Sequence, residues 1–353
     1  MTTRGPAERI ADVRRLQQAA RAVVAERATL VPALVASTGL STEGVELALA
    51  RHVELEATDD ELATLVTRAG DAARITIVLS ANVFVGALRA IALARAASTD
   101  VVVRPSRRDP AFARALVESA RARGDSCVRL DESLDVASID AGEVHVYGHD
   151  DTIAEVRKQA RVPVRGHGSG MGAVWISALA DLDDAARDVA DDVVVFDQRG
   201  CLSPRVVLVH GDQVRAMALA DALHAELDRR ATSVPRGEVP ADERAAAGRY
   251  VATMTYAFRA LVGRQHAIGV APPGAPLVLP PPYRHVHVAA CASLEMAATL
   301  LAPLRKGIVT IGSDEQEAAR VLAPAWARLA CLGAMQRPAL DGPVDLRESI
   351  GFE

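Results

Sequence analysis

The stretch Arg74-Ile-Thr-Ile-Val-Leu-Ser80 is a short run rich in β-branched residues, and a helical segment separates it from a second such run, Asp100-Val-Val-Val-Arg104. Short apolar runs bounded by polar residues are typical of buried strands. A strand, a helix and another strand in succession predict a parallel βαβ unit with a right-handed crossover. Sheets built from such units bind nucleotides at the carboxyl ends of their strands.

The alternation of strand and helix continues along the chain and predicts an α/β fold. We expect helices before the first strand at 7–36, 42–50 and 59–69. We expect further strands at 143–147, 162–165, 205–210, 285–289 and 307–311. We expect helices between and after them at 86–97, 110–123, 152–160, 181–190, 213–230, 249–262 and 294–304.

The length of 353 residues suggests two domains. We assign residues 1–170 to a nucleotide-binding domain that includes the N-terminal helices. Residues 171–330 form a catalytic domain in this division. Residues 331–353 are expected to return to the first domain or to form part of a subunit interface.

Composition and charge narrow the class of protein. Half of the residues are hydrophobic, 24% are charged and the net charge is −5, which disfavours a nucleic-acid binder that relies on bulk electrostatics. No apolar stretch approaches the roughly 18–20 residues of a membrane helix. Residues 1–10 are polar and charged, unlike a secretory signal. We therefore expect a cytoplasmic protein without a nucleic-acid partner or a membrane span.

The cysteines and histidines are not spaced as metal ligands. The cysteines are Cys127, Cys201, Cys291 and Cys331. None belongs to a CxxC pair, so neither a structural zinc site nor a disulfide framework is expected. His285 and His287 are two residues apart on a predicted strand, but no carboxylate partner is evident. We expect no metal site.

Cys201 is the candidate nucleophile. Gly200 precedes it, and a glycine there permits close backbone approach, so that an oxyanion can lie against main-chain N–H groups. A thiolate suits a thioester substrate, since exchange of sulfur for sulfur conserves bond energy and leaves a reactive acyl-cysteine. A lone Gly-Cys pair, however, is more often a buried structural cysteine.

The run Phe196-Asp-Gln-Arg-Gly-Cys-Leu-Ser-Pro204 resembles the Phe-Asp-Gln-x-x-Cys-x-Ser-Pro signature of LuxC-type acyl-CoA reductases, within the aldehyde dehydrogenase superfamily. Further motifs of these proteins occur in the same order, namely Ser37-Thr-Gly39, Asn82-Val-Phe84, Val103-Arg-Pro-Ser106 and Leu332-Gly-Ala-Met-Gln-Arg-Pro338. The resemblance implies an aldehyde-dehydrogenase-like fold, with two domains that each hold a mainly parallel sheet.

The resemblance also implies roles for Cys201 and Asn82. Cys201 would attack an acyl-CoA, with the side-chain amide of Asn82 and the Cys201 N–H holding the oxyanion. A nicotinamide cofactor would then deliver hydride, and the thiohemiacetal would release an aldehyde. Without the resemblance, an ordinary turn residue after a strand is the favoured interpretation of Asn82.

Residues Arg104, Pro105, Ser106 and Arg107 are the first group of predicted cofactor contacts. Arg104 takes the place of a cofactor-contacting lysine of the superfamily. Arg107 stands where NAD-preferring relatives often carry a glutamate, and an arginine would attract a 2′-phosphate. We therefore expect NADPH, with NADH as the other candidate. The alternative is a solvated charged run at a strand end.

Gly148 and His149 form the second group, at the strand-to-helix turn where the superfamily places Gly-Ser for the pyrophosphate. Gly148 fits this role, whereas His149 and Asp150 depart from it. Acidic residues here would oppose a diphosphate. Either the cofactor lies farther away, or the helix start serves only for capping.

His167 lies in the run Gly166-His-Gly-Ser-Gly-Met-Gly172. Hydrolytic aldehyde dehydrogenases carry a water-activating glutamate there, and the alignment puts Gly166 or His167 at its position. Loss of that glutamate suits an enzyme whose acyl-cysteine is resolved by hydride. His167 is a candidate base for Cys201. The alternative is a histidine hydrogen-bonded within a tight loop.

Together these features imply NADPH-dependent reduction of an acyl-CoA, with a fatty acyl group as the expected substrate, by a homo-oligomer. An acyl-transferring or acyl-activating enzyme is a candidate partner. Three alternatives remain: a reductase of an acyl group delivered by a carrier or partner protein, a hydrolytic aldehyde dehydrogenase, and a non-catalytic scaffold subunit of the same fold.

Overall fold

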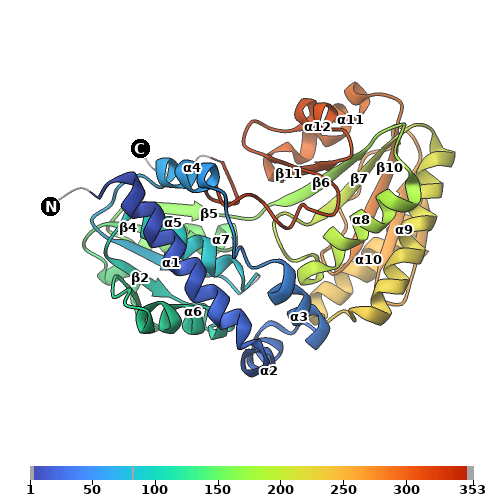
Figure 1. The fold of residues 1–353 in the computed structure, drawn as a ribbon. Helices are drawn as coiled ribbons and strands as arrows, with labels where there is room; N and C mark the ends of the chain where they lie inside the picture. Colours follow the sequence, from blue (N-terminus) through green and yellow to red (C-terminus); the bar gives the residue numbers. More distant parts are fainter. Residues whose placement is uncertain (1–3, 82, 348–353) are drawn as a thin grey trace. The chain divides into compact units, whose positions relative to one another are not determined.

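The computed structural model describes residues 4–81 and 83–347, and the chain divides into two compact units (Figure 1). Of the described residues, the first unit comprises 4–38, 45–81, 83–169 and 339–347, and the second comprises 39–44 and 170–338. Both units combine helices with a β-sheet, which confirms the predicted α/β class. The nucleotide-binding and catalytic roles assigned to the parts stay predictions.

The sheet of the first unit is parallel throughout. Its strands are β1 (Ile75–Val78), β2 (Val101–Arg104), β3 (Val128–Leu130), β4 (Glu143–Tyr147) and β5 (Val164–His167). They lie in the order β3-β2-β1-β4-β5, and all neighbouring pairs are parallel. The direction of winding reverses between β1 and β4. In doubly wound sheets, ligands bind outside the carboxyl ends of the strands at such a reversal.

Helices α5 (Gly86–Ala97), α6 (Ala111–Ala122) and α7 (Asp150–Gln159) pack against this sheet, and α1 (Pro6–Ala25) packs on α5 and α6. The other helical segments before residue 170 are α2 (Arg27–Thr38), α3 (Thr42–Arg51), α4 (Asp59–Ala69) and the 3₁₀ turn η1 (Val136–Ser138). Ile153 and Val156 of α7 pack into a buried cluster with apolar strand residues, namely Val78, Val144, Val146 and Val164. This packing holds the start of α7 beside the carboxyl end of β4.

The sheet of the second unit is mixed. Its strands are β6 (Met171–Ile176), β7 (Pro204–His210), β8 (Arg259–Val262), β9 (Ala267–Ala271), β10 (His285–Cys291), β11 (Ile308–Ser313) and β12 (Arg328–Ala330). They lie in the order β12-β11-β6-β7-β10-β9-β8. The pair β8–β9 is antiparallel, whereas the other neighbouring pairs are parallel.

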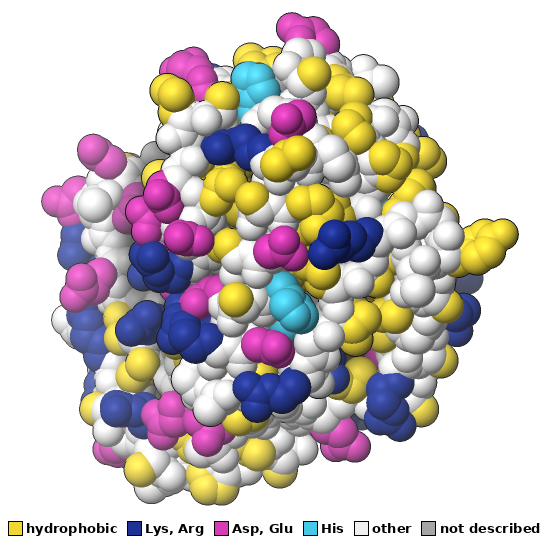
Figure 2. Space-filling model, turned by 90° about the vertical axis from the view of Figure 1, so that its right-hand side faces the viewer, with side chains coloured by type: hydrophobic (Ala, Val, Ile, Leu, Met, Phe, Trp, Pro, Cys, Tyr) yellow, Lys and Arg dark blue, Asp and Glu magenta, His cyan; other side chains and the backbone are white. Residues whose placement is uncertain are grey.

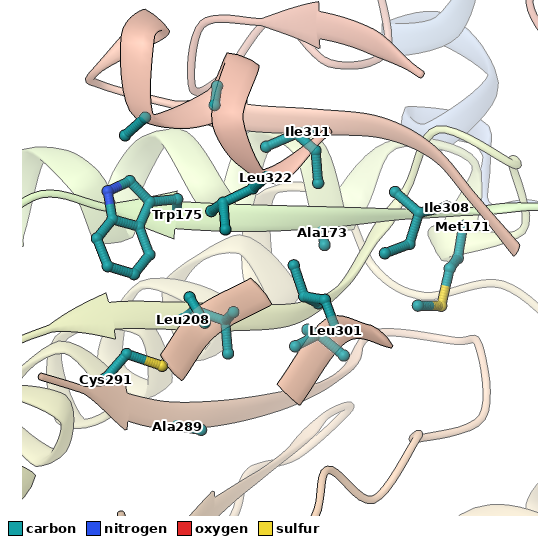
Figure 3. Packing of buried hydrophobic residues seen from close by; sticks show 14 residues of the cluster. Met171, Ala173, Trp175, Leu208, Ala289, Cys291, Leu301, Ile308, Ile311 and Leu322 are labelled. Carbon is teal, nitrogen blue, oxygen red and sulfur yellow. The ribbon is translucent and has the colours of Figure 1, made fainter. Parts of the chain in front are cut away.

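One face of this sheet carries a large apolar core (Figure 3). Trp175 of β6, Leu208 of β7 and Cys291 of β10 are fully buried there, under Leu301 and Leu322. The helical segments of this unit are α8 (Leu182–Val194), η2 (Val195–Gln198), α9 (Gln213–Ser233), α10 (Ala241–Ala257), α11 (Leu294–Leu301), η3 (Ala302–Gly307) and α12 (Gln316–Leu322). Burial on both faces of the sheet explains the apolar runs 206–209 of β7 and 288–291 of β10.

The second unit differs from the sequence prediction in the end of one helix and in strands that were not predicted. The helix predicted at 249–262 ends at Ala257, and residues 259–262 form β8. The Gly263 N–H donates to the His266 carbonyl at 3.0 Å, which closes a turn and lays β8 against β9. The stretches 171–176, 267–271 and 328–330, for which no strand was predicted, form β6, β9 and β12.

The charged surface and the helices of the described residues agree with what the composition predicts. Basic and acidic side chains are interspersed on the face drawn in Figure 2. Over residues 4–81 and 83–347, no helix has both the length and the apolar character that crossing a membrane requires.

Candidate active site

Cys201 lies in the loop that joins η2 to β7, and its side chain is half-buried. The three residues Phe196, Asp197 and Gln198 before the loop all have positive φ, at 53°, 51° and 62°. The left-handed region costs an L-residue roughly 1–2 kcal/mol. Three such residues in succession require strong tertiary contacts to hold them.

The first of these contacts is a buried ion pair between Asp197 and Arg284. The Arg284 guanidinium donates from Nε to Asp197 Oδ1 at 2.9 Å, and its Nη2 lies 2.7 Å from the same oxygen. Both side chains are 2% exposed. The Gly237 N–H donates to Asp197 Oδ2 at 2.9 Å, and the Tyr283 N–H donates to the Asp197 carbonyl at 3.1 Å. The left-handed segment before Cys201 is thereby fixed to the chain before β10.

Gln198 supplies the second contact. Its Nε2 donates to the carbonyls of Pro204 at 2.7 Å and His285 at 2.8 Å, while its Oε1 accepts the His285 N–H at 2.9 Å. Pro204 begins β7 and His285 begins β10, which are neighbours in the sheet. The buried amide therefore fastens the loop to the amino ends of two adjacent strands.

The chain after Cys201 is held from two other directions. The Ser203 N–H donates to the Gly200 carbonyl at 3.1 Å, which closes a turn around Cys201. The Ser203 carbonyl accepts the Gly172 N–H at 2.9 Å, and its hydroxyl accepts from Gln336 Nε2 at 3.0 Å. The run 332–338, far away in the sequence, thus contacts the Cys201 loop directly.

Two glycines of the 166–172 run are needed for close approach to this loop. A Cβ at Gly170 would lie 3.3 Å from the Cys201 Cβ and 2.7 Å from Val309 Cγ1. A Cβ at Gly172 would lie 2.5 Å from the Leu202 carbonyl oxygen. Any larger residue would displace the loop, so these glycines shape the surroundings of Cys201.

The predicted cofactor residues lie in the first unit. Arg104 ends β2 and is half-buried, Pro105 is buried, Ser106 is half-buried and Arg107 is exposed. Gly148 follows β4, with the exposed His149 beside it. Since β2, β1 and β4 are parallel neighbours, the structure brings both groups to the carboxyl edge of one sheet.

The turn after β4 is occupied by an acidic side chain. Asp150 Oδ1 accepts the Ser169 N–H at 2.9 Å. A Cβ at Gly168 would clash with this carboxylate, and one at Gly166 would lie 2.5 Å from Ile153 Cγ2. The glycines therefore let the 166–169 loop pack on the first turn of α7. A carboxylate in this position opposes a diphosphate, so the contacts of Gly148 and His149 stay a prediction that this turn does not favour.

His167 ends β5 and stacks on Tyr147 of β4, with ring centroids 4.4 Å apart and planes 13° from parallel. His145 approaches the same ring edge-on at 6.2 Å. Desolvation lowers the pKa of His167 to about 3, helped by the nearby His145, Arg165 and Arg347. An imidazole with this pKa stays neutral and accepts a proton weakly at neutral pH. The base role of His167 stays a prediction, which this environment disfavours.

Other predicted features are placed as follows. Asn82 lies outside the described residues. Among the residues that are described, no group of three or more His, Cys, Asp and Glu side chains is arranged to hold a metal ion. The contacts of Asp197, Gln198 and Ser203 were not predicted, because their partners are distant in sequence and no local pattern indicates them.

Comparison with known proteins bears on this geometry. A family model described as acyl-CoA reductase (LuxC) matches residues 58–347, a span that includes the Cys201 loop and the 332–338 run. The chain belongs to the LuxC acyl-CoA reductase family. This membership confirms the resemblance seen in the sequence, and with the fold below it supports an oxidoreductase that acts on acyl or aldehyde groups.

Solved structures show the same fold. A NAD-dependent aldehyde dehydrogenase from Sinorhizobium meliloti is 17% identical with a TM-score of 0.68, covering 93% of this chain and 75% of that one. An oxidoreductase from Marinobacter aquaeolei is 12% identical with a TM-score of 0.72, covering 96% and 80%. The expected aldehyde-dehydrogenase-like fold is confirmed.

A match to one sequence relative covers a shorter part of the chain. Delta-1-pyrroline-5-carboxylate synthase 2 from Oryza sativa subsp. japonica is 30% identical over 115 residues. The match spans 33% of this chain and 14% of the rice protein. The similarity is therefore confined to a small part of that relative.

Proposed function

We propose that the protein reduces an acyl-CoA to an aldehyde with NADPH, through an acyl-cysteine on Cys201. One observation carries the proposal. The polar residues that flank Cys201 in its motif, Asp197, Gln198 and Ser203, are buried and hydrogen-bonded, whereas the Cys201 side chain keeps partial exposure. The flanking residues hold the loop, and the partly exposed Cys201 is the residue of the motif that a substrate can reach.

The acylation step balances within the site. The Cys201 sulfur forms a bond to the thioester carbonyl carbon, and the bond from that carbon to the sulfur of CoA breaks. CoA leaves as a thiol with the proton that Cys201 gave up. The backbone N–H of Cys201, at the turn closed by Gly200 and Ser203, is the proposed donor to the oxyanion, together with the side chain of Asn82.

The residues at the end of β2 fit the cofactor better than those at the end of β4. Arg107 is an exposed guanidinium at the carboxyl edge of the sheet, suited to a 2′-phosphate, whereas Asp150 places a carboxylate at the β4 turn. When bound, NADPH supplies the hydride that takes the acyl group to the oxidation level of an aldehyde. Cleavage of the carbon–sulfur bond to Cys201 then frees the aldehyde and restores the thiolate.

The chain has no counterpart of the water-activating glutamate of hydrolytic aldehyde dehydrogenases, so water should compete poorly with hydride for the acyl-cysteine. A hydrolytic dehydrogenase needs a base that activates water on the acyl-enzyme. His167, one of the two residues aligned with that glutamate, has a pKa of about 3 and stacks on Tyr147. Neither its basicity nor its surroundings suit that role, which favours resolution by hydride.

The test is the stoichiometry of the reaction with acyl-CoAs of several chain lengths. We expect one aldehyde and one free CoA thiol for each NADPH oxidised, and none of these with Cys201→Ala. Steady thiol release without oxidation of NADPH would identify a thioesterase instead. NADH formation from an aldehyde in the absence of CoA would identify a hydrolytic dehydrogenase.

A further inference from the structure

Asp192, a buried carboxylate near the end of α8, is bonded to the 332–338 run. Its Oδ2 accepts the Gly333 N–H at 2.8 Å and its Oδ1 accepts the Met335 N–H at 2.9 Å. The residue is 1% exposed. Both oxygens are committed to one turn, and Gly333 has a φ of 71°, which suits glycine. The carboxylate therefore fixes the conformation of residues 333–336.

This turn is connected to the nucleophile loop by Gln336. Its Nε2 donates to Ser203 Oγ at 3.0 Å and to the Asp192 carbonyl at 3.4 Å. Ser203 is 0% exposed, and its N–H closes the turn with Gly200 that contains Cys201. A continuous series of hydrogen bonds thus leads from Asp192 to the residue two positions beyond the thiol.

Met335 gives the turn a defined seat. Its side chain lies over Gly172 of β6 and Gly312 of β11, where an added Cβ would come within 2.6 Å of Met335 Cε and 2.5 Å of Met335 Sδ respectively. These strands are neighbours in the sheet. Since the slot is made by two missing side chains, a shift of the turn would unseat Met335 as well as Gln336.

We propose that Asp192 is a positioning residue for Cys201, because its carboxylate holds the 333–336 turn that fixes Ser203 and the Cys201 turn through Gln336. The proposal rests on the function proposed for Cys201. It gives Asp192 no contact with the substrate, and it assigns the 332–338 motif to orientation of the nucleophile.

The ionisation of Asp192 supports this arrangement. Burial raises the pKa of Asp192 to about 7, against the N–H bonds from Gly333 and Met335, which favour the charged form. The charged groups near it are Asp191 and Asp188 on α8, Arg230 of α9, which pairs with Asp191, and Arg337, which donates to the Gly333 carbonyl. The turn is held more tightly as Asp192 ionises, so the geometry at Cys201 depends on pH near neutrality.

The test measures the alkylation of Cys201 by iodoacetamide against pH, with modified peptides identified by mass so that other cysteines are counted separately. For the wild type we expect an inflection near pH 7 in addition to the ionisation of the thiol. Asp192→Asn keeps the size of the side chain but can accept only one of the two N–H bonds. It should remove the inflection, change the alkylation rate several-fold and lower kcat about 10-fold with little change in KM.

Two further variants keep the result interpretable. Asp191→Asn, next along the same helix and paired with Arg230, is the matched control. It should keep kcat and retain the inflection, moved to lower pH because the charge of Asp191 helps to raise the pKa of Asp192. Gln336→Met removes the bond to Ser203 and the bond to the Asp192 carbonyl but leaves the Asp192 carboxylate in place. It should reproduce the loss seen with Asp192→Asn, even if that variant fails to fold.

Alkylation and reduction are scored separately. If the wild type makes no aldehyde but Asp192→Asn still changes the alkylation profile of Cys201, the proposed function is wrong and the positioning role is supported. Wild-type alkylation profiles and kcat in folded Asp192→Asn and Gln336→Met would overturn the positioning role and leave the proposed function intact.

Discussion

The Cys201 loop and the carboxyl edge of the first unit's sheet differ in how many contacts within the protein fix the conformation of their side chains. In the loop, Asp197, Gln198 and Ser203 are almost fully buried and bonded to the surrounding chain. At the sheet edge, the predicted contacts Arg107 and His149 are exposed. A nucleophile needs its geometry before the substrate arrives, whereas a cofactor completes its own site on binding. The difference tells which substitutions should affect stability and which should affect cofactor choice alone.

The largest expected effect is the loss of activity on replacing Cys201. Cys201→Ala should lower kcat for acyl-CoA reduction by roughly 10⁴-fold or more, as removal of a covalent nucleophile does in other enzymes. The measurement is NADPH oxidation under saturating acyl-CoA. Cys331→Ala, which removes an exposed thiol outside the loop, is the control. Comparable losses in both variants would show that the rate depends on thiols in general and not on this loop.

The next effect concerns the frame of the loop. Asp197→Ala leaves the Arg284 guanidinium buried without its carboxylate, and such a change costs about 3–5 kcal/mol of unfolding free energy. Urea unfolding followed by circular dichroism measures this cost. The matched control is Asp221→Ala, which removes an exposed partner of Arg259 and should cost at most about 1 kcal/mol. Equal losses of unfolding free energy in the two variants would mean that the ion pair between Asp197 and Arg284 does not stabilise the loop more than an exposed ion pair would.

His285, beside the Cys201 loop, should make the stability of the protein sensitive to acid. Desolvation lowers the pKa of His285, whose backbone holds Gln198, to about 4. Its unfolded pKa is about 6.5, so below that pH the unfolded chain takes up a proton that the folded chain refuses. Stability is therefore lost as the pH falls from about 6.5 towards 4, by up to about 3 kcal/mol.

The test compares the wild type with His285→Gln. The variant should reduce the dependence of unfolding free energy on pH over this window without abolishing it, because burial also lowers the pKa of His266 and of His287 to about 4. Unfolding curves at pH 4.5, 5.5 and 6.5 supply the slopes. A slope as steep as that of the wild type would show that His285 does not contribute to the acid sensitivity.

The smallest expected effect lies at the sheet edge. Arg107→Glu should raise KM for NADPH about 10-fold and leave KM for NADH unchanged, because a charge-assisted bond to phosphate is worth roughly 1.5–3 kcal/mol. Arg108→Glu makes the same charge change at the adjacent exposed residue and serves as the control. An equal rise in KM for NADPH in both variants would mean that the effect comes from the overall charge of the surface and not from a contact between Arg107 and the 2′-phosphate.

Much of the fold follows from local pattern, and much of the site does not. The apolar runs at 75–78, 101–104 and 285–291 are strands because their residues are buried on both faces. The strand β6 was not predicted because glycines lie beside and within its apolar run. The strand β8 was not predicted because the helical pattern of the sequence continues past Ala257.

The site depends on contacts between distant parts of the chain. Arg284 lies 87 residues from Asp197, and Met335 lies 143 residues from Asp192. Spacing along a chain does not reveal which strands become neighbours, so the sequence indicated Cys201 by motif but not the side chains that hold its loop. His167 was placed by alignment, yet its pKa depends on Tyr147 and its other neighbours in space.

The intact mass of the protein after mixing with an acyl-CoA in the absence of NADPH tests the central claim most directly. The account predicts a mass increase of one acyl group on Cys201, stable to water over the time of turnover. It also predicts that addition of NADPH discharges the adduct and yields one equivalent of aldehyde. An adduct on another residue, no adduct with any acyl-CoA, or an adduct that water removes as fast as NADPH would contradict the account.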